Sequence, residues 1–306
     1  MSATEFSYSQ DMLRQLAADV LRHARELGAT ACETDASEAF GLSVTVRKSQ
    51  VETIEYNRDK GIGVTTYLGQ CRGHASTSDF SPQALRATVA AALSIARLTA
   101  ADPCAGLPDA QLLAKRSMDL ELYHPWHLPV EEAIVIARQC EQAAFAVSPL
   151  ISNSEGASVS LQHSQFVFAN SLGFMGGFPT SRHFISCAVI AGKGKRMQRD
   201  DWYTSARDWS ALAAPQAVGD YAARRALSRL GAKRLKTRQV PVLFEAPLAS
   251  GLIGSFVHAV SGGTLYRKSS FLLDSIGQRI FPKHVHISER PICPAPWPAA
   301  RSTMTV

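Results

Sequence analysis

The residues best suited to chemistry lie in and beside one predicted helix, which begins near Pro247 and ends at residues 262–263. Its large apolar residues recur at helical spacing along one face: Leu248, Leu252, Phe256 and Val260. Its opposite face has almost no side-chain bulk: Gly251, Ser255, His258 and Gly262. Such a bare face serves either the close packing of another backbone or the floor of a substrate site, and packing is the more common use.

A short apolar run over residues 240–244 precedes this helix and is bounded by charged residues, which predicts a buried strand. Glu245 follows at the end of that strand, beside the bare helix face. A role as general acid or base would require a cleft that shifts the pKa of Glu245. A solvated glutamate at a strand end is the ordinary alternative.

Two pairs of histidines have spacings that could serve a metal ion. His284 and His286 alternate on a probable strand, and His124 and His127 lie in the aromatic segment 123–127. Neither pair has a third ligand nearby in the sequence, so surface histidines and a loop packed by its own rings are the preferred interpretations. No histidine is followed by glutamate, and the six cysteines include no C-x-x-C pair. We therefore predict no catalytic residue and no metal site in this chain.

The surrounding pattern predicts helices and strands in alternating groups. Apolar periodicity predicts helices over residues 10–27, 81–98, 129–145 and 214–230. Alternation predicts strands over residues 41–47, 51–56, 62–68, 74–77, 151–161, 165–170 and 173–191. Turns are expected at residues 57–61 and 69–73 and at His163, and residues 99–115 resemble a linker.

Composition is that of a globular protein, with 46% hydrophobic and 19% charged residues and a net charge of +6. There is no apolar run long enough to span a membrane and no secretory pattern at the N-terminus. We therefore expect a cytoplasmic protein with reduced thiols and no membrane contact. Seven basic residues cluster between Arg224 and Arg238, without interleaved aromatic residues. A solvated helix face explains them better than a nucleic-acid surface does.

Several stretches resemble the PmbA/TldD family, which is linked with DNA gyrase modulation and microcin maturation. Residues 223–256 and 47–85 resemble its members closely, as do the NSEGA and ANSLGF motifs at residues 153–157 and 169–174. The run GGTLYRKSSFLLDSIGQRI, residues 262–280, is similar to the PmbA (TldE) branch. The resemblance implies an α+β fold with an N-terminal α/β domain (1–115), a strand-rich middle domain (116–235) and an incomplete β-rich C-terminal domain (236–291).

TldD-type members of the family carry a His-Glu-x-x-x-His metal motif on the helix described first. By resemblance its positions fall at Gly254, Ser255 and Ala259, so all three metal-site residues are absent here. The resemblance then implies a PmbA (TldE)-like subunit of a cytoplasmic TldD/TldE metalloprotease, with no cofactor in this chain and zinc in its TldD-like partner. Substrates would be peptides, as in microcin maturation or the degradation of antitoxins or unfolded peptides. Glu245, Gly254, Ser255 and His258 are the expected substrate-binding residues.

Two alternatives remain open. The chain could be a non-catalytic regulatory or adaptor protein linked to DNA gyrase modulation, or a non-functional gene fragment. The resemblance stops after Pro291, and residues 292–306 are rich in proline and alanine. We expect this tail to be unrelated to the family and out of frame, a hypothesis that sequencing the gene across codon 291 would test.

Overall fold

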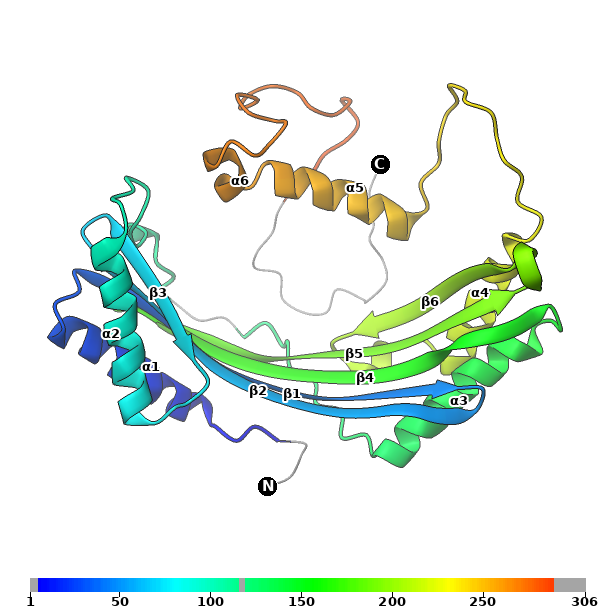
Figure 1. Ribbon diagram of the computed structural model, residues 1–306, viewed down its shortest axis with the longest axis horizontal. Coiled ribbons are helices and arrows are strands. Elements are labelled where there is room, and N and C mark those ends of the chain that lie inside the picture. The colour runs from blue at the N-terminus through cyan, green and yellow to red at the C-terminus, as the bar shows by residue number, and fades with distance from the viewer. Residues whose placement is uncertain (1–4, 116–118, 289–306) are drawn as a thin grey trace. The chain divides into compact units, whose positions relative to one another are not determined.

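The computed structural model describes residues 5–115 and 119–288 (Figure 1). The chain forms two compact units, and the first passes into the second along the chain between residues 232 and 233. The first unit is α+β, as predicted. Its six strands form one antiparallel sheet in the order β3-β2-β1-β4-β5-β6. These strands are β1 (Ala31–Arg47), β2 (Gln50–Leu68), β3 (Cys71–Thr77), β4 (Ile151–Asn170), β5 (Met175–Ala191) and β6 (Gln198–Ala206).

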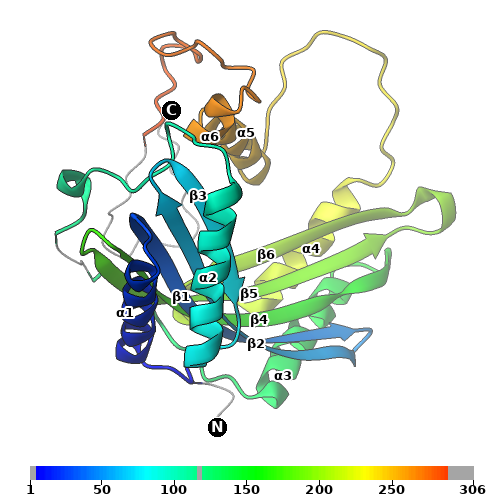
Figure 2. The ribbon, with the colours of Figure 1, turned by 60° about the vertical axis from the view of Figure 1, so that its left-hand side comes forward.

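Four helices cover one face of this sheet: α1 (Gln10–Glu26), α2 (Pro82–Leu98), α3 (Val130–Ala146) and α4 (Pro215–Ser228) (Figures 1 and 2). Short 3-10 turns occur at Ala110–Leu112, Gly194–Arg196 and Trp209–Ala211. Buried and more exposed residues alternate along the strands, because successive side chains point to opposite faces of the sheet and one face lies under the helices. Val44 and its cross-strand partner Val159 are both buried on that face. The core has two parts, one under α1 and α2 and one under α3 and α4.

The predicted helices are confirmed, but two predicted turns are wrong. Residues 57–61 continue β2, because they pair with residues 37–41 of β1. His163 lies in the middle of β4, opposite Phe40 of β1 and Ser181 of β5. Long-range pairing thus holds both turn-like segments extended, against their local preference.

Glycines allow two helices to lie directly on their neighbours. A Cβ atom at Gly73 of β3 would overlap the Ala92 carbonyl oxygen of α2. A Cβ atom at Gly219 of α4 would overlap the Cys140 carbonyl oxygen of α3. Only glycine permits backbones to approach this closely.

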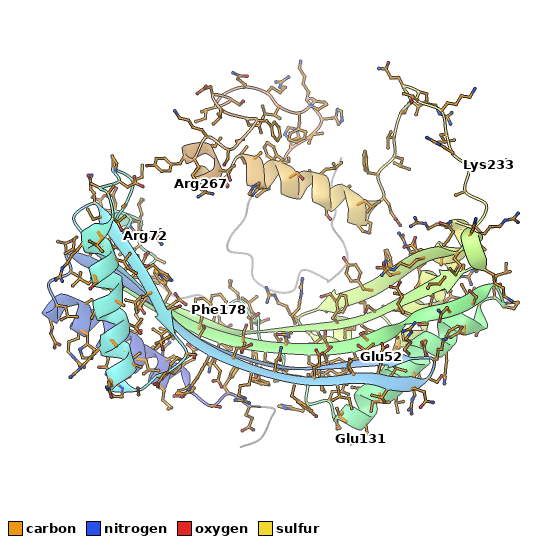
Figure 3. The ribbon with its side chains drawn as sticks, viewed as in Figure 1. Glu52, Arg72, Glu131, Phe178, Lys233 and Arg267 are labelled. Carbon is orange, nitrogen blue, oxygen red and sulfur yellow. The ribbon has the colours of Figure 1, made fainter. Side chains whose placement is uncertain are left out.

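The face of the sheet away from the helices is mostly small and polar, with a few aromatic contacts. Ser158, Ser160 and Ser164 of β4 are partly exposed on this face. Phe178 of β5 also lies there, with its ring centroid 4.9 Å from that of Phe166 (Figure 3). Within the described part of the first unit, no helix covers this face.

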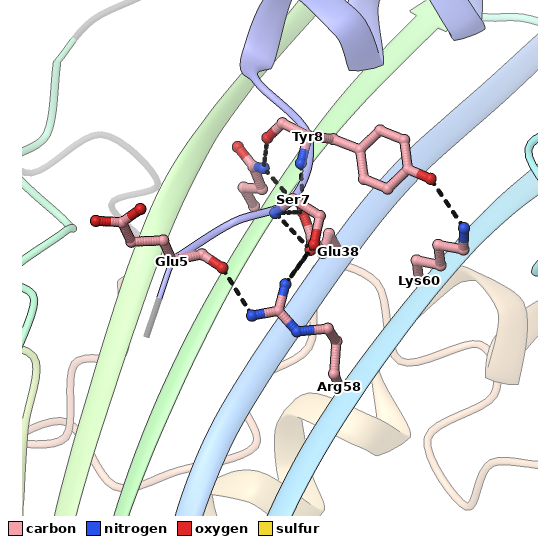
Figure 4. A network of polar contacts seen from close by, with 7 residues as sticks. Glu5, Ser7, Tyr8, Glu38, Arg58 and Lys60 are labelled. Atoms are coloured by element: carbon pink, nitrogen blue, oxygen red, sulfur yellow. Dashed lines mark hydrogen bonds and ion pairs between the residues drawn. The ribbon is translucent and has the colours of Figure 1, made fainter. Parts of the chain in front are cut away.

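The segment before α1 is attached to the sheet through Glu38 of β1. The Glu38 carboxylate accepts hydrogen bonds from the backbone N–H groups of Ser7 (2.9 Å and 3.0 Å) and Tyr8 (3.1 Å) (Figure 4). Arg58 donates to the same carboxylate at 2.9 Å, and Lys60 donates to the Tyr8 hydroxyl at 2.9 Å. A buried carboxylate is tolerated here because these donors satisfy its oxygens.

The second unit contains α5 (Ala246–Ala259) and the short α6 (Gly262–Tyr266). The predicted helix is confirmed, although it ends at Ala259, and residues 262–263 begin α6 instead of stopping α5. The predicted buried strand at residues 240–244 is wrong: this segment is irregular and exposed, with Leu243 97% exposed. Residues 292–306, the predicted out-of-frame tail, lie outside the described residues.

Candidate functional site

A pocket of about 500 Å³ lies along the bare face of α5. It is lined by Gly251, Gly254, Ser255, His258, Ala259, Ser269, Ser270 and Phe271. Three of the four predicted substrate-binding residues, Gly254, Ser255 and His258, therefore share one site. They come together because residues three and four apart lie on the same side of a helix.

Glu245, the fourth predicted residue, does not line this pocket. It precedes α5 as its N-cap residue, and its carbonyl oxygen accepts the N–H groups of Leu248 (2.9 Å) and Ala249 (2.8 Å). Glu245 thus helps to begin the helix, whereas the pocket lies over the middle and end of the helix.

No described residue packs against the glycines on the bare face of α5. A Cβ atom added at Gly251 or Gly254 would meet no described atom within 4 Å. The Ser255 hydroxyl donates to the Gly251 carbonyl oxygen at 2.9 Å, as serine does inside helices. The described chain therefore supplies no backbone that packs closely on this face.

The pocket offers hydroxyl groups, one imidazole and one aromatic ring, but no carboxylate. The positions of the family metal motif, Gly254, Ser255 and Ala259, provide a single hydroxyl as a possible ligand. Zinc sites use sulfur, imidazole nitrogen and carboxylate oxygen, usually from three or four side chains. The residues of this helix therefore do not fit a zinc ion. Within residues 5–115 and 119–288, no three His, Cys, Asp or Glu side chains converge on a possible metal position.

The structure also shows the surroundings of the His284 and His286 pair and of the basic cluster between Arg224 and Arg238. His284 and His286 lie in an irregular segment, so the predicted strand that would align them is wrong. In the basic cluster, Arg225 of α4 and Arg229, which caps the C-terminal end of α4, both contact Asp200 of β6, at 3.3 Å and 3.5 Å. These ion pairs join the end of the helix to the edge of the sheet. The Arg225 side chain is only 22% exposed and also lies over the Trp202 ring, so at this position the predicted solvated face is wrong.

A second group of polar residues, which sequence reasoning missed, lies under the segment 119–129 on the helix-covered face of the sheet. His163 of β4 and His183 of β5 are 5% and 0% exposed, and their ring centroids are 5.4 Å apart. Burial, with His183 and His127 nearby, lowers the pKa of His163 to about 4. Burial also lowers the pKa of His183, although its hydrogen bond to the His124 carbonyl oxygen opposes the shift. Both imidazoles are therefore neutral at neutral pH.

The segment 123–127 packs against other parts of the first unit, which differs from the predicted loop packed by its own rings. Trp126 stacks on Trp209 with 5.7 Å between ring centroids and contacts the edge of His183 at 5.5 Å. Tyr123 contacts His163 at 6.0 Å. The sequence signal for this cluster was the aromatic segment itself, but its partners on β4 and β5 depend on strand register.

Three models of one family match consecutive parts of the chain. They are the PmbA/TldA metallopeptidase domain 1 at residues 32–96, the central domain at residues 123–230 and the C-terminal domain at residues 237–302. The Escherichia coli protein named Metalloprotease PmbA is 45% identical over 259 residues, which are 85% of this chain and 58% of that protein. A Metalloprotease PmbA homolog from Haemophilus influenzae is 42% identical over 279 residues, 91% of this chain and 62% of that protein. The chain thus spans about three fifths of the length of these relatives.

Solved structures with a similar fold include a protein from Bacteroides thetaiotaomicron described as a candidate modulator of DNA gyrase. It superimposes with a TM-score of 0.80 at 21% identity, over 87% of this chain and 61% of that one. TldE from Thermococcus kodakarensis superimposes with a TM-score of 0.66 at 13% identity, over 85% of this chain and 58% of that one. At these identities the structures establish similarity of fold alone.

Proposed function

The chain belongs to the PmbA/TldD metallopeptidase family, and on this premise we propose that it is the PmbA (TldE)-like subunit of a TldD/TldE metalloprotease. In this proposal a TldD-like subunit supplies the zinc ion and the hydrolytic chemistry. This chain supplies peptide-binding surface in the processing or degradation of peptides. The relatives are named metalloproteases, which supports the reaction class.

The α5 pocket is the observation that carries the proposal. Its residues can contact a peptide: Ser255, Ser269 and Ser270 offer hydroxyl groups, His258 an imidazole and Phe271 an apolar ring. They provide neither a carboxylate base nor a set of zinc ligands. Metal-assisted peptide hydrolysis needs both an activated water molecule and stabilisation of the charge that develops on the carbonyl oxygen. A second subunit that provides them is the simplest way to reconcile this helix with a metallopeptidase family.

We also propose a cytoplasmic location for this complex. Support comes from the cysteines, of which Cys32, Cys71, Cys104, Cys140 and Cys187 are all free thiols in the described residues. Within those residues, no helix is both long and apolar enough to cross a membrane. Fractionation of cells that express the tagged chain would test the location, and recovery outside the cytoplasmic fraction would contradict it.

The proposal is tested by purifying the chain and a TldD-like protein from the same organism, separately and together. Zinc content, peptidase activity on an unfolded polypeptide and co-elution on size exclusion are measured for each sample. We expect zinc with the TldD-like protein, a stable complex, and full activity only in the mixture. Stoichiometric zinc bound by the lone chain would overturn the assigned division of roles.

The same experiment distinguishes the proposed subunit role from the adaptor and fragment alternatives. A complex whose peptidase activity is independent of this chain would favour a regulatory or adaptor protein. Absence of both association and activity would favour the interpretation as a non-functional fragment.

A further inference from the structure

The face of the sheet away from the helices carries two arginines side by side. Arg182 of β5 lies on this face, because the next residue, His183, is buried under the helices. His183 pairs with Ala206 of β6, so Arg207, the residue that follows β6, lies across from Arg182. The Arg207 guanidinium donates a hydrogen bond from Nη1 to the hydroxyl of Thr180, which shares the face of Arg182. Both guanidinium groups therefore occupy the same part of this face.

The structure supplies no negative charge to balance these two arginines. Among the residues that it describes, no Asp or Glu lies within ion-pair distance of Arg182 or Arg207. The cross-strand partner of Arg182 on β4 is the neutral Gln162. Burial and the nearby charge of Arg182 lower the pKa of the Arg207 guanidinium. Like charges directly opposite one another in a sheet are destabilising, so an anion bound between them would relieve their repulsion.

Two pairs of aromatic rings flank the arginines along β5, on the same face. Phe178 precedes Arg182 and contacts Phe166 of β4, with 4.9 Å between ring centroids (Figure 3). Phe184 follows Arg182 and stacks on Tyr203 of β6 at 5.2 Å. Phe178 and Tyr203 are 39% and 48% exposed, so each pair offers apolar surface to a ligand. The two positive charges therefore lie between two partly exposed apolar contacts.

We propose that Arg182 and Arg207 bind the carboxylate of an acidic residue in an extended peptide, whose apolar side chains on either side contact the two aromatic pairs. Guanidinium groups suit this role because they donate two parallel N–H···O bonds to one carboxylate. A phosphate group would satisfy the arginines equally well, but only a peptide also brings apolar side chains to both aromatic pairs. The ligand class rests on the proposed function, and the site adds a preference for acidic peptides on the first unit.

Three fluorescently labelled peptides with blocked ends serve as probes. The first, GLSSSESLG, places a glutamate between two leucines at the spacing of Phe178, Arg182 and Phe184 along β5. The second has glutamine in place of the glutamate, and the third has serine in place of both leucines. Anisotropy is measured as the full 306-residue chain is added, without a TldD-like protein. We expect the first peptide to bind saturably with a Kd below about 1 mM, the second about tenfold more weakly and the third about fivefold more weakly.

The variants Arg182→Gln and Arg207→Gln each remove one of the two charges. In either variant the preference for the glutamate peptide over the glutamine peptide should fall to about threefold or less, because one guanidinium no longer contacts the carboxylate. The matched control is Arg86→Gln on α2, which removes an exposed arginine from the helix side of the sheet and lowers the net charge equally. It should keep the full preference. Circular dichroism checks that all three variants are folded.

Three outcomes would overturn the proposal. The first is equal affinity of the wild-type chain for the glutamate and glutamine peptides. The second is an unchanged preference in both folded arginine variants. The third is an equal loss of preference in Arg86→Gln, which would make the effect one of overall charge. Because no TldD-like protein is present and no hydrolysis is measured, each of these results would leave the two-subunit proposal to its own experiment.

Discussion

Arg58 and Glu38 form an ion pair in which Arg58 Nη1 lies 2.9 Å from Glu38 Oε1 and the Glu38 side chain is only 2% exposed. The same carboxylate accepts the N–H groups of Ser7 and Tyr8, and Gln165 of β4 donates to the Tyr8 carbonyl oxygen at 2.6 Å. One buried side chain on a central strand therefore organises the segment that leads into α1.

Replacing Glu38 by Gln should lower the free energy of unfolding by about 2 to 4 kcal/mol, because Arg58 and two N–H donors lose a charged acceptor. Urea unfolding followed by circular dichroism would measure the loss. The control is Glu52→Gln, which removes a pair with Arg47 whose side chains are 43% and 42% exposed. That change should cost less than about 1 kcal/mol. Equal losses in the two variants would contradict a special role for the buried pair.

Replacing Gly219 by Ala should lower the free energy of unfolding by about 2 to 3 kcal/mol, despite the better helix propensity of alanine. The added methyl group would overlap the Cys140 carbonyl oxygen and push α4 away from α3. Thermal unfolding measures the effect. The control Gly61→Ala places a methyl group 3.9 Å from the nearest atom, the Thr77 carbonyl oxygen, and should change stability far less. A stabilised Gly219→Ala variant would show that the two helices do not touch there.

Acid should destabilise the first unit through His163. Burial lowers the pKa of His163 from 6.5 to about 4, so above pH 6.5 the imidazole is neutral in the folded and unfolded chains alike. Between pH 6.5 and about 4 the unfolded chain binds a proton that the folded chain excludes, and the free energy of unfolding falls as the pH falls. At about pH 4.5 this loss amounts to roughly 2.5 kcal/mol.

Urea unfolding at about pH 7 and about pH 4.5 tests this dependence in wild type, His163→Gln and His284→Gln. The His163→Gln variant should lose about 2 to 3 kcal/mol less than wild type over this range, because glutamine does not titrate. The exposed His284 serves as the matched control, and its variant should follow wild type. An identical pH dependence in all three chains would contradict the lowered pKa of His163.

Filling the α5 pocket should weaken peptide binding by the proposed two-subunit enzyme. The variant Gly254→Leu adds bulk where no described atom lies within 4 Å, so the helix should form normally. In the mixture with a TldD-like protein we expect KM to rise by about tenfold, with little change in kcat or in association. The control Ser250→Leu adds similar bulk to α5 outside the pocket lining. Unchanged KM in Gly254→Leu would remove the pocket from the peptide path.

Helices could be predicted well because their signals are local. For α2, Ser81 caps the helix by accepting the N–H of Ala84, and Pro82 occupies its first position, as the sequence pattern predicts. The continuity of β2 could not be predicted, because residues 57–61 have the composition of a turn. They are held extended by residues 37–41 of β1, which lie about 20 residues away in the chain.

The candidate site residues also differ in whether local sequence or long-range strand pairing brings them together. Gly254, Ser255 and His258 could be grouped from sequence, because helical spacing is enough to align them. The buried pair of His163 and His183 could not, since it depends on the register that places His163 opposite Phe40 and Ser181. The apolar run at residues 240–244 looked like a buried strand, but no strand among the described residues pairs with it. Apolar sequence indicates a tendency to be buried, whereas burial itself requires a neighbour.

The pairing of β1 with β4 also means that β1 is synthesised well before its partner strand. Glu33 of β1 pairs with Asn170 of β4, which the ribosome makes about 140 residues later. At about 5 to 20 residues per second, β1 waits roughly 7 to 28 seconds for this partner. During that interval the edge of β1 that β4 later covers is unpaired, and such an edge invites pairing with other chains. Efficient production of this protein should therefore depend on chaperone protection of this edge until β4 has been made, and not on the stability of the finished fold alone.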